Sequence, residues 1–119
     1  MFLRASFAAA LLWVPALCQG AEGDLDVTFG TGGVTSVALG SGCTVTALAR
    51  QSDGRLVAAG YVQSGGTAGR DGCLMRFTSA GQLDSTFGSN GVVTVDFGTT
   101  SDWLNSLLIL DNNLILAAG

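Results

Sequence analysis

The chain has 119 residues, of which 48% are hydrophobic, 12% are charged and 18 are glycine, and its formal net charge is −4 at pH 7. This apolar, charge-poor composition excludes an intrinsically disordered tail, because disordered segments are rich in charge and poor in apolar residues. It also argues against nucleic-acid binding, because the five cations are scattered arginines, whereas phosphate recognition needs clustered positive charge.

The residue inventory favours a protein without catalytic, cofactor-binding or metal-binding residues. Histidine and lysine are both absent, which excludes the usual Ser-His-Asp and Cys-His nucleophile systems, histidine-ligated zinc and a P-loop lysine. Glu22 is the single glutamate, so acid–base chemistry would fall to eight aspartates, to Tyr61 or to a thiol. We therefore assign no catalytic, cofactor or metal residue from the sequence, and we expect this chain not to be an enzyme.

Residues 1–20 have the pattern of a secretory signal peptide. Arg4 supplies one positive charge, and the mostly apolar stretch of thirteen residues that follows, 5–17, is too short to cross a bilayer of about 30 Å as a helix. Small residues would permit cleavage after Cys18 or after Gly20. A lipoprotein attached through Cys18 and an N-terminal core helix are the alternatives. The signal peptide predicts an exported protein (periplasmic, cell-surface or extracellular) with no membrane span in the mature chain.

An internal repeat organises the rest of the chain. Residues 25–34 (LDVTFGTGGV) match residues 83–92 (LDSTFGSNGV) at an offset of 58, and seven of the ten positions are identical. Residues 47–60 then align with residues 106–119 at an offset of 59, and both segments end in Ala-Ala-Gly. Self-similarity at this spacing is typical of repeat architectures. We predict a first unit at about 25–82 and an incomplete second unit at about 83–119.

Short strands separated by turns are predicted from residue 44 onwards, through the first unit and into the second. Residues 44–50 favour a strand, and Gln51-Ser52-Asp53-Gly54 predicts a type I′ hairpin turn, because Asp-Gly tolerates the positive φ that this turn requires. The return strand follows at 55–62, a third strand at 73–77 and, after a turn at 78–81, a fourth at 92–97. These elements predict a four-stranded antiparallel meander.

In the second copy the apolar run at 103–110 is compatible with a strand or with a buried helix, because periodicity cannot separate the two in so short a segment. Its alignment with residues 44–50 favours the strand. Asn112-Asn113 takes the place of the Asp-Gly turn, and asparagine tolerates left-handed backbone.

The repeated block at 25–34 and 83–92, with the segment QSDGRLVAAG at 51–60, resembles the signature of the delta-60 repeat family. The resemblance covers residues 24–119 and departs from the family pattern at Cys73-Leu74-Met75 and at the Asn-Asn turn. It implies tandem repeats of an exported or surface bacterial protein, with a β-propeller-like fold and no assigned enzymatic activity. The predicted fold class is all-β: antiparallel four-stranded meander repeats, β-propeller-like, with about 1.6 blades of the usual four to eight.

Asp26 and Asp84 open the two copies of the repeated block and could be taken for catalytic or calcium-binding carboxylates. Because both copies share the arrangement, we expect a structural role instead. Each carboxylate would accept a hydrogen bond from the backbone N–H two residues on and so pin a turn. The phenylalanine that follows in each copy, Phe29 or Phe87, would pack between the units.

Cys43 and Cys73 fall at the starts of the first and third predicted strands. Two strands that flank a shared neighbour place their Cα atoms about 9–10 Å apart, whereas a disulfide needs less than roughly 7 Å. We therefore expect two free, mostly buried thiols rather than a bridge, although a disulfide is possible in principle because an exported chain meets an oxidising compartment.

These observations predict the N-terminal portion of a longer exported repeat protein, acting as a non-catalytic binding or scaffold module at the cell surface or in the periplasm, with a protein or a glycan as its partner. The alternative is part of an exported β-propeller enzyme, a hydrolase or lyase, whose active site lies in missing blades. A third hypothesis is self-association through an open apolar edge at 114–116.

Overall fold

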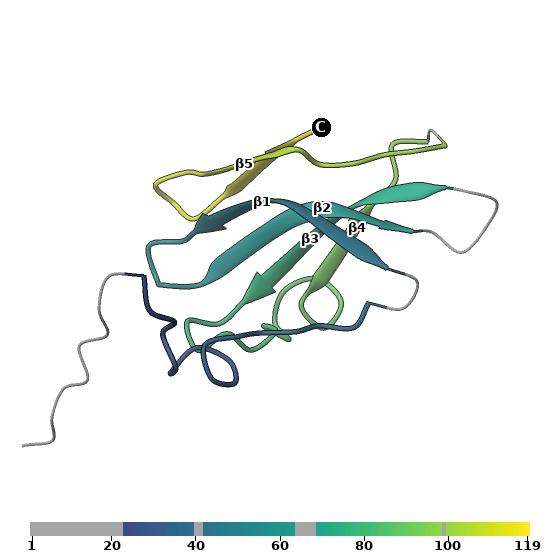
Figure 1. Ribbon diagram of the computed structural model, residues 1–119. Coiled ribbons are helices and arrows are strands. Elements are labelled where there is room, and N and C mark those ends of the chain that lie inside the picture. Colours follow the sequence, from purple (N-terminus) through teal and green to yellow (C-terminus); the bar gives the residue numbers. More distant parts are fainter. Residues whose placement is uncertain (1–22, 40–41, 64–68, 99) are drawn as a thin grey trace, which may run out of the picture.

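The computed structural model describes residues 23–39, 42–63, 69–98 and 100–119 (Figure 1). The predicted signal peptide at 1–20 lies outside these residues. All regular structure in the described part of the chain is β, in two antiparallel sheets. The strands are β1 (Cys43–Arg50), β2 (Leu56–Gln63), β3 (Arg70–Phe77), β4 (Val92–Val95), β5 (Ser106–Ile109) and β6 (Ile115–Ala118). The described residues contain no helix that is long and apolar enough to cross a bilayer.

The first sheet has the order β1-β2-β3-β4, with every strand antiparallel to its neighbour. β2 and β3 pair along their full length, from Leu56 opposite Phe77 to Gln63 opposite Arg70. The predicted four-stranded meander is therefore confirmed. The third strand begins three residues earlier than predicted, at Arg70, and the fourth ends at Val95.

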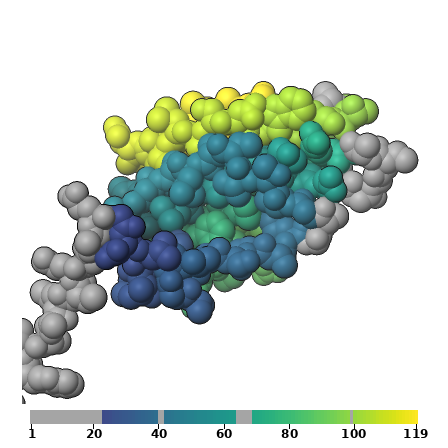
Figure 2. Space-filling view, in the orientation of Figure 1, coloured from purple at the N-terminus to yellow at the C-terminus, as the bar shows by residue number. Residues whose placement is uncertain are grey.

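The second sheet is the β5–β6 hairpin, so residues 103–110 contain a strand and not the alternative helix. The hairpin lies along β1 (Figure 1). The amide N of Leu104 donates a 3.1 Å hydrogen bond to the carbonyl of Gly60, and the hydroxyl of Thr46 donates to the carbonyl of Leu104. Figure 2 shows the yellow-green atoms of this hairpin against the blue atoms of the first sheet. The two sheets are thus joined by hydrogen bonds as well as by packing.

The hairpin turns have a different geometry from the predicted type I′ turn. In the first, the amide N of Gln51 donates to the Arg55 carbonyl at 2.8 Å and that of Gly54 to the Gln51 carbonyl at 3.0 Å. Gly54 has a φ of +87°, whereas Asp53 keeps a negative φ. A three-residue loop with one left-handed residue at its end explains this pattern. The type I′ prediction was wrong because only one of the two central positions turns left-handed.

The core lies around the central strand β2. Ala58 on one of its faces packs with Cys73 and Met75 of β3, and all three are buried. Because side chains alternate across a strand, Val57 and Ala59 lie on the opposite face, where both are fully buried. Several leucines of the hairpin remain more than half exposed: Leu108, Leu114 and Leu116.

Phe29 and Phe87 are both half-buried, and neither belongs to the buried core. The Phe87 ring lies against the guanidinium of Arg76, with its centroid 4.6 Å from the Arg76 Cζ atom. Phe87 of the second unit thus contacts Arg76 of the first, but the expectation that the two rings form a buried core between the units was wrong.

Candidate functional site

The repeated Asp-x-Thr-Phe-Gly turns have the same backbone geometry in both copies. Oδ1 of Asp26 accepts from the amide N of Thr28 at 3.0 Å and from its hydroxyl at 2.5 Å. Oδ1 of Asp84 accepts from the same two groups of Thr86 at 3.0 and 2.6 Å. The predicted turn-pinning hydrogen bonds are confirmed. They also hold the pKa of both carboxyl groups below the ordinary value, because they favour the charged form.

Asp84 differs from Asp26 in its surroundings. It is 5% exposed, and its Oδ2 atom lies 2.8 Å from Nε of Arg76 and 3.2 Å from Nε of Arg55. The bonds from Thr86, helped by Arg76, lower the pKa of Asp84 to about 2. A carboxylate so fully occupied by donors is neither a free base nor an open ligand position, so its role is to hold the turn.

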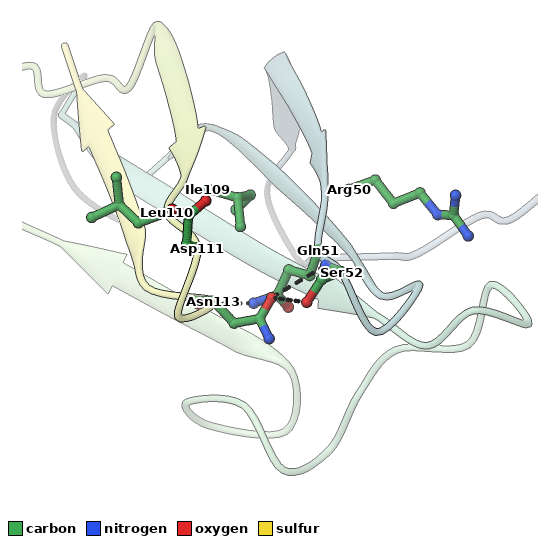
Figure 3. Close-up of a pocket in the computed structure, with 7 residues that line it drawn as sticks. All are labelled: Arg50, Gln51, Ser52, Ile109, Leu110, Asp111 and Asn113. Atoms are coloured by element: carbon green, nitrogen blue, oxygen red, sulfur yellow. Dashed lines mark hydrogen bonds between the residues drawn. The ribbon is translucent and has the colours of Figure 1, made fainter.

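A groove of about 430 Å³ lies where the turn between β1 and β2 meets the turn between β5 and β6 (Figure 3). These two turns are equivalent in the repeat, and Asn113, with a φ of +61°, occupies in the second the position of Gly54 in the first. The lining residues are Arg50, Gln51, Ser52, Ile109, Leu110, Asp111 and Asn113. The groove is therefore formed by both units together.

Polar side chains converge at the floor of this groove (Figure 3). Nε2 of Gln51 donates to the Asn113 carbonyl at 3.0 Å, and the Ser52 hydroxyl lies 2.9 Å from Oδ1 of Asn113. Gln51 is only 4% exposed. Its Oε1 atom is buried and has no hydrogen-bond partner, and it is the one such side-chain atom among the described residues. Because a buried acceptor without a partner is costly, this atom is the most specific polar feature of the groove.

Three carboxylates also come together away from the groove. One oxygen from each of Asp71, Asp96 and Asp102 lies within 4.8 Å of the others, and Asp102 is buried. Oδ2 of Asp102 accepts from the amide N of Phe97 at 2.8 Å. Such oxygens suit a hard cation, but three acids alone do not define a metal site. Sequence reasoning missed this group because the three residues span 32 positions and only the fold brings them together.

Cys43 and Cys73 are free thiols, Cys73 fully buried and Cys43 half-buried. The expected free thiols are thus present in the structure. Burial raises the pKa of Cys73 to about 11, and burial also raises the pKa of Cys43.

Residues 51–87 match a family model described as a domain of unknown function (DUF5122) beta-propeller. The matched segment runs from the first hairpin turn through β2 and β3 to the second Asp-x-Thr-Phe turn. No curated protein and no solved structure matches the chain significantly. The match and the sheet agree on the fold class, an all-β antiparallel meander of the β-propeller-like kind.

Proposed function

We propose that this chain is an exported, non-catalytic repeat module of the delta-60 kind that binds a protein or glycan partner in the groove between its two hairpin turns. The repeated blocks and the match to a β-propeller family model support the repeat assignment. The signal-like pattern of residues 1–20 supports export.

The observation that carries the binding role is the buried, unpartnered Oε1 atom of Gln51, a residue that lines the groove. A partner that donates an N–H or O–H group to this atom would recover the cost of burying it, about 1–3 kcal/mol. Backbone amides of a peptide and hydroxyls of a glycan both provide such donors. Ser52 and Asp111 add further polar groups to the lining of the groove.

Binding is tested by applying the labelled protein to a glycan array and a peptide array, then titrating the best binder. Gln51→Met keeps the side-chain length and removes the Oε1 acceptor together with the Nε2 donor to Asn113, so affinity should fall about tenfold for one hydrogen bond lost to the partner. Gln82→Met, at an exposed position outside this groove, is the matched control and should bind as the unaltered chain does. No binder on either array, or equal affinity for both variants, would contradict the proposal.

Export is tested by N-terminal sequencing of the protein recovered from outside the cytoplasm. The expected first residue is Gln19 or Ala21, for cleavage after Cys18 or Gly20 respectively. A chain that keeps Met1 and stays with the cytoplasmic fraction would contradict export.

The exposed leucines of the β5–β6 hairpin favour self-association as a second candidate function. Leu114 and Leu116 are 58% and 57% exposed, and β6 pairs with β5 alone in the described part of the chain. The free edge of an apolar strand is a template for another strand. Size-exclusion chromatography with light scattering should show dimers that Leu116→Lys converts to monomers. A monomer at all concentrations would rule this function out.

A further inference from the structure

Gly60 lets β1 cross closely over β2. The pairing of β1 with β2 contains a bulge between Val45 and Ala47, and Val45 is the partner of Gly60. A Cβ atom placed on Gly60 would overlap the Thr44 carbonyl oxygen and would lie 3.1 Å from Cα of Val45. The backbone of β1 therefore occupies the space that a side chain at position 60 would fill.

This crossing brings β1 onto the face of the sheet that holds Cys73. In β3, Cys73 is paired with Gly60. Paired residues of neighbouring strands project from the same face of a sheet, so the Cys73 side chain lies on the face on which Gly60 lacks a side chain. Cys43, the first residue of β1, packs against the buried cluster that contains Cys73. The two thiols are neighbours in this cluster, and Cys73 partly offsets the effect of burial on the pKa of Cys43.

We propose that Cys43 and Cys73 are a modification site that an oxidant converts to a disulfide, tying β1 to β3 across Gly60. A separation of about 9–10 Å holds for two strands of a flat sheet that flank a third. At Gly60 β1 departs from this arrangement, because its backbone occupies the space of the missing side chain and the pairing has a bulge.

The chemistry is thiol–disulfide exchange with the disulfide of a thiol–disulfide oxidoreductase or of oxidised glutathione. Cys43, the more exposed thiol, loses its proton, attacks one oxidant sulfur and releases the other as a thiolate. Cys73 then loses its proton, attacks the Cys43 sulfur and expels the second thiolate. The two protein thiols lose two electrons and two protons, and the oxidant disulfide becomes two thiols. Because both thiol pKa values are raised, the reaction should accelerate with increasing pH.

Only the cellular occurrence of this reaction rests on the export proposed above, since an oxidising compartment supplies the oxidant. The reaction in vitro does not depend on export, because the experiment supplies the oxidant. A negative result with purified protein would overturn the disulfide and leave the export and binding proposals untouched.

The test uses the full chain carrying Cys18→Ser, which leaves Cys43 and Cys73 as its two thiols. The folded protein is treated with oxidised glutathione at pH 8.5, the remaining thiols are blocked, and the protein is denatured and digested with trypsin. Cleavage after Arg50, Arg70 and Arg76 separates the cysteines, because they fall on residues 5–50 and 71–76. Mass spectrometry should find these two peptides joined, with the mass of two hydrogens lost.

The matched control adds Cys43→Ser and Thr44→Cys, which keeps two thiols and moves one to the next residue of β1. Adjacent residues of a strand point to opposite faces, so this variant should give glutathione adducts and little cross-link. In the test protein the cross-link should raise the melting temperature by roughly 10 °C. Glutathione adducts alone, equal cross-linking in the control, or a cross-link that does not raise the melting temperature would overturn the proposal.

Discussion

Nε of Arg76 lies 2.8 Å from Oδ2 of Asp84, so a cation of β3 holds the carboxylate that pins the following turn. Arg55, at the end of the first hairpin loop, contacts the same oxygen at 3.2 Å. One buried carboxylate therefore connects the hairpin loop, β3 and the repeated turn. Asp26, its equivalent in the first copy, has the turn bonds but no arginine partner among the described residues.

Asp84→Ala should destabilise the protein much more than Asp26→Ala. The first substitution removes the turn bonds and leaves Arg76 without its carboxylate in a site that is largely buried. The second removes the turn bonds alone, at an exposed position. We expect the melting temperature to fall by about 10 °C for Asp84→Ala and by about 3 °C for Asp26→Ala. Differential scanning calorimetry measures both, and equal losses would show that the arginines contribute nothing.

Stability should decline in acid partly through Asp84. The folded state holds the pKa of Asp84 at about 2, below its ordinary value of 3.8. The ionised carboxylate therefore stabilises the folded state above about pH 4, and this contribution is lost as the pH falls towards 2. Urea midpoints measured between pH 5 and pH 2 should fall, and Asp84→Asn should flatten this decline. A residual slope is expected in that variant because the pKa values of Asp26 and Asp53 are also lowered. An identical slope in the two proteins would exclude Asp84 as a contributor.

Gly60→Ala should destabilise the protein by about 1–3 kcal/mol, because overpacked positions force the backbone to shift. The added methyl group would meet the backbone of Thr44 and Val45. Gly72→Ala is the control: its Cβ would lie 3.2 Å from Cγ of Leu104 and 3.3 Å from the Val95 carbonyl oxygen, tight contacts that need much smaller shifts than the overlap at Gly60. Urea unfolding should therefore show a smaller loss for Gly72→Ala. The reverse order would mean that β1 does not approach Gly60 so closely.

Asn113 stabilises the second turn through its left-handed backbone and through the hydrogen bonds that its Oδ1 atom accepts, and two substitutions separate these contributions. Its φ of +61° is left-handed, and an alanine there costs about 1–2 kcal/mol. Asn113→Gly accepts this backbone geometry but loses the bonds from Ser52 to Oδ1. We expect Asn113→Ala to lower the urea midpoint more than Asn113→Gly. Both variants lose the bonds from Ser52 to Oδ1, so equal losses for alanine and glycine would mean that the left-handed backbone contributes nothing.

The strands and repeated turns could be predicted because their causes are local. Runs of β-branched and small residues specify β1 and β2. An aspartate two residues before a threonine accepts the hydrogen bonds that hold the turn, so the turn is specified by this short motif alone. The left-handed residue of the second turn also follows from alignment with Gly54.

The groove and the thiol contact could not be predicted in the same way. Gln51 and Asn113 are 62 positions apart and meet only because the second hairpin docks on β1. The approach of Cys43 to Cys73 depends on a bulge and on the missing side chain of Gly60, which a flat-sheet estimate ignores. The prediction of free thiols agreed with the structure.

The boundary of the sequence repeat falls inside a sheet. β4 follows the second Asp-x-Thr-Phe-Gly turn, yet it pairs with β3 of the preceding copy. If a gene duplication copies one whole repeat, the first strand of the new copy would therefore pair with the sheet already present. The new segment would be hydrogen-bonded to its neighbour from the start. Lengthening such an array needs no newly evolved interface, and a tandem gene of this kind can change its copy number while each added part remains anchored.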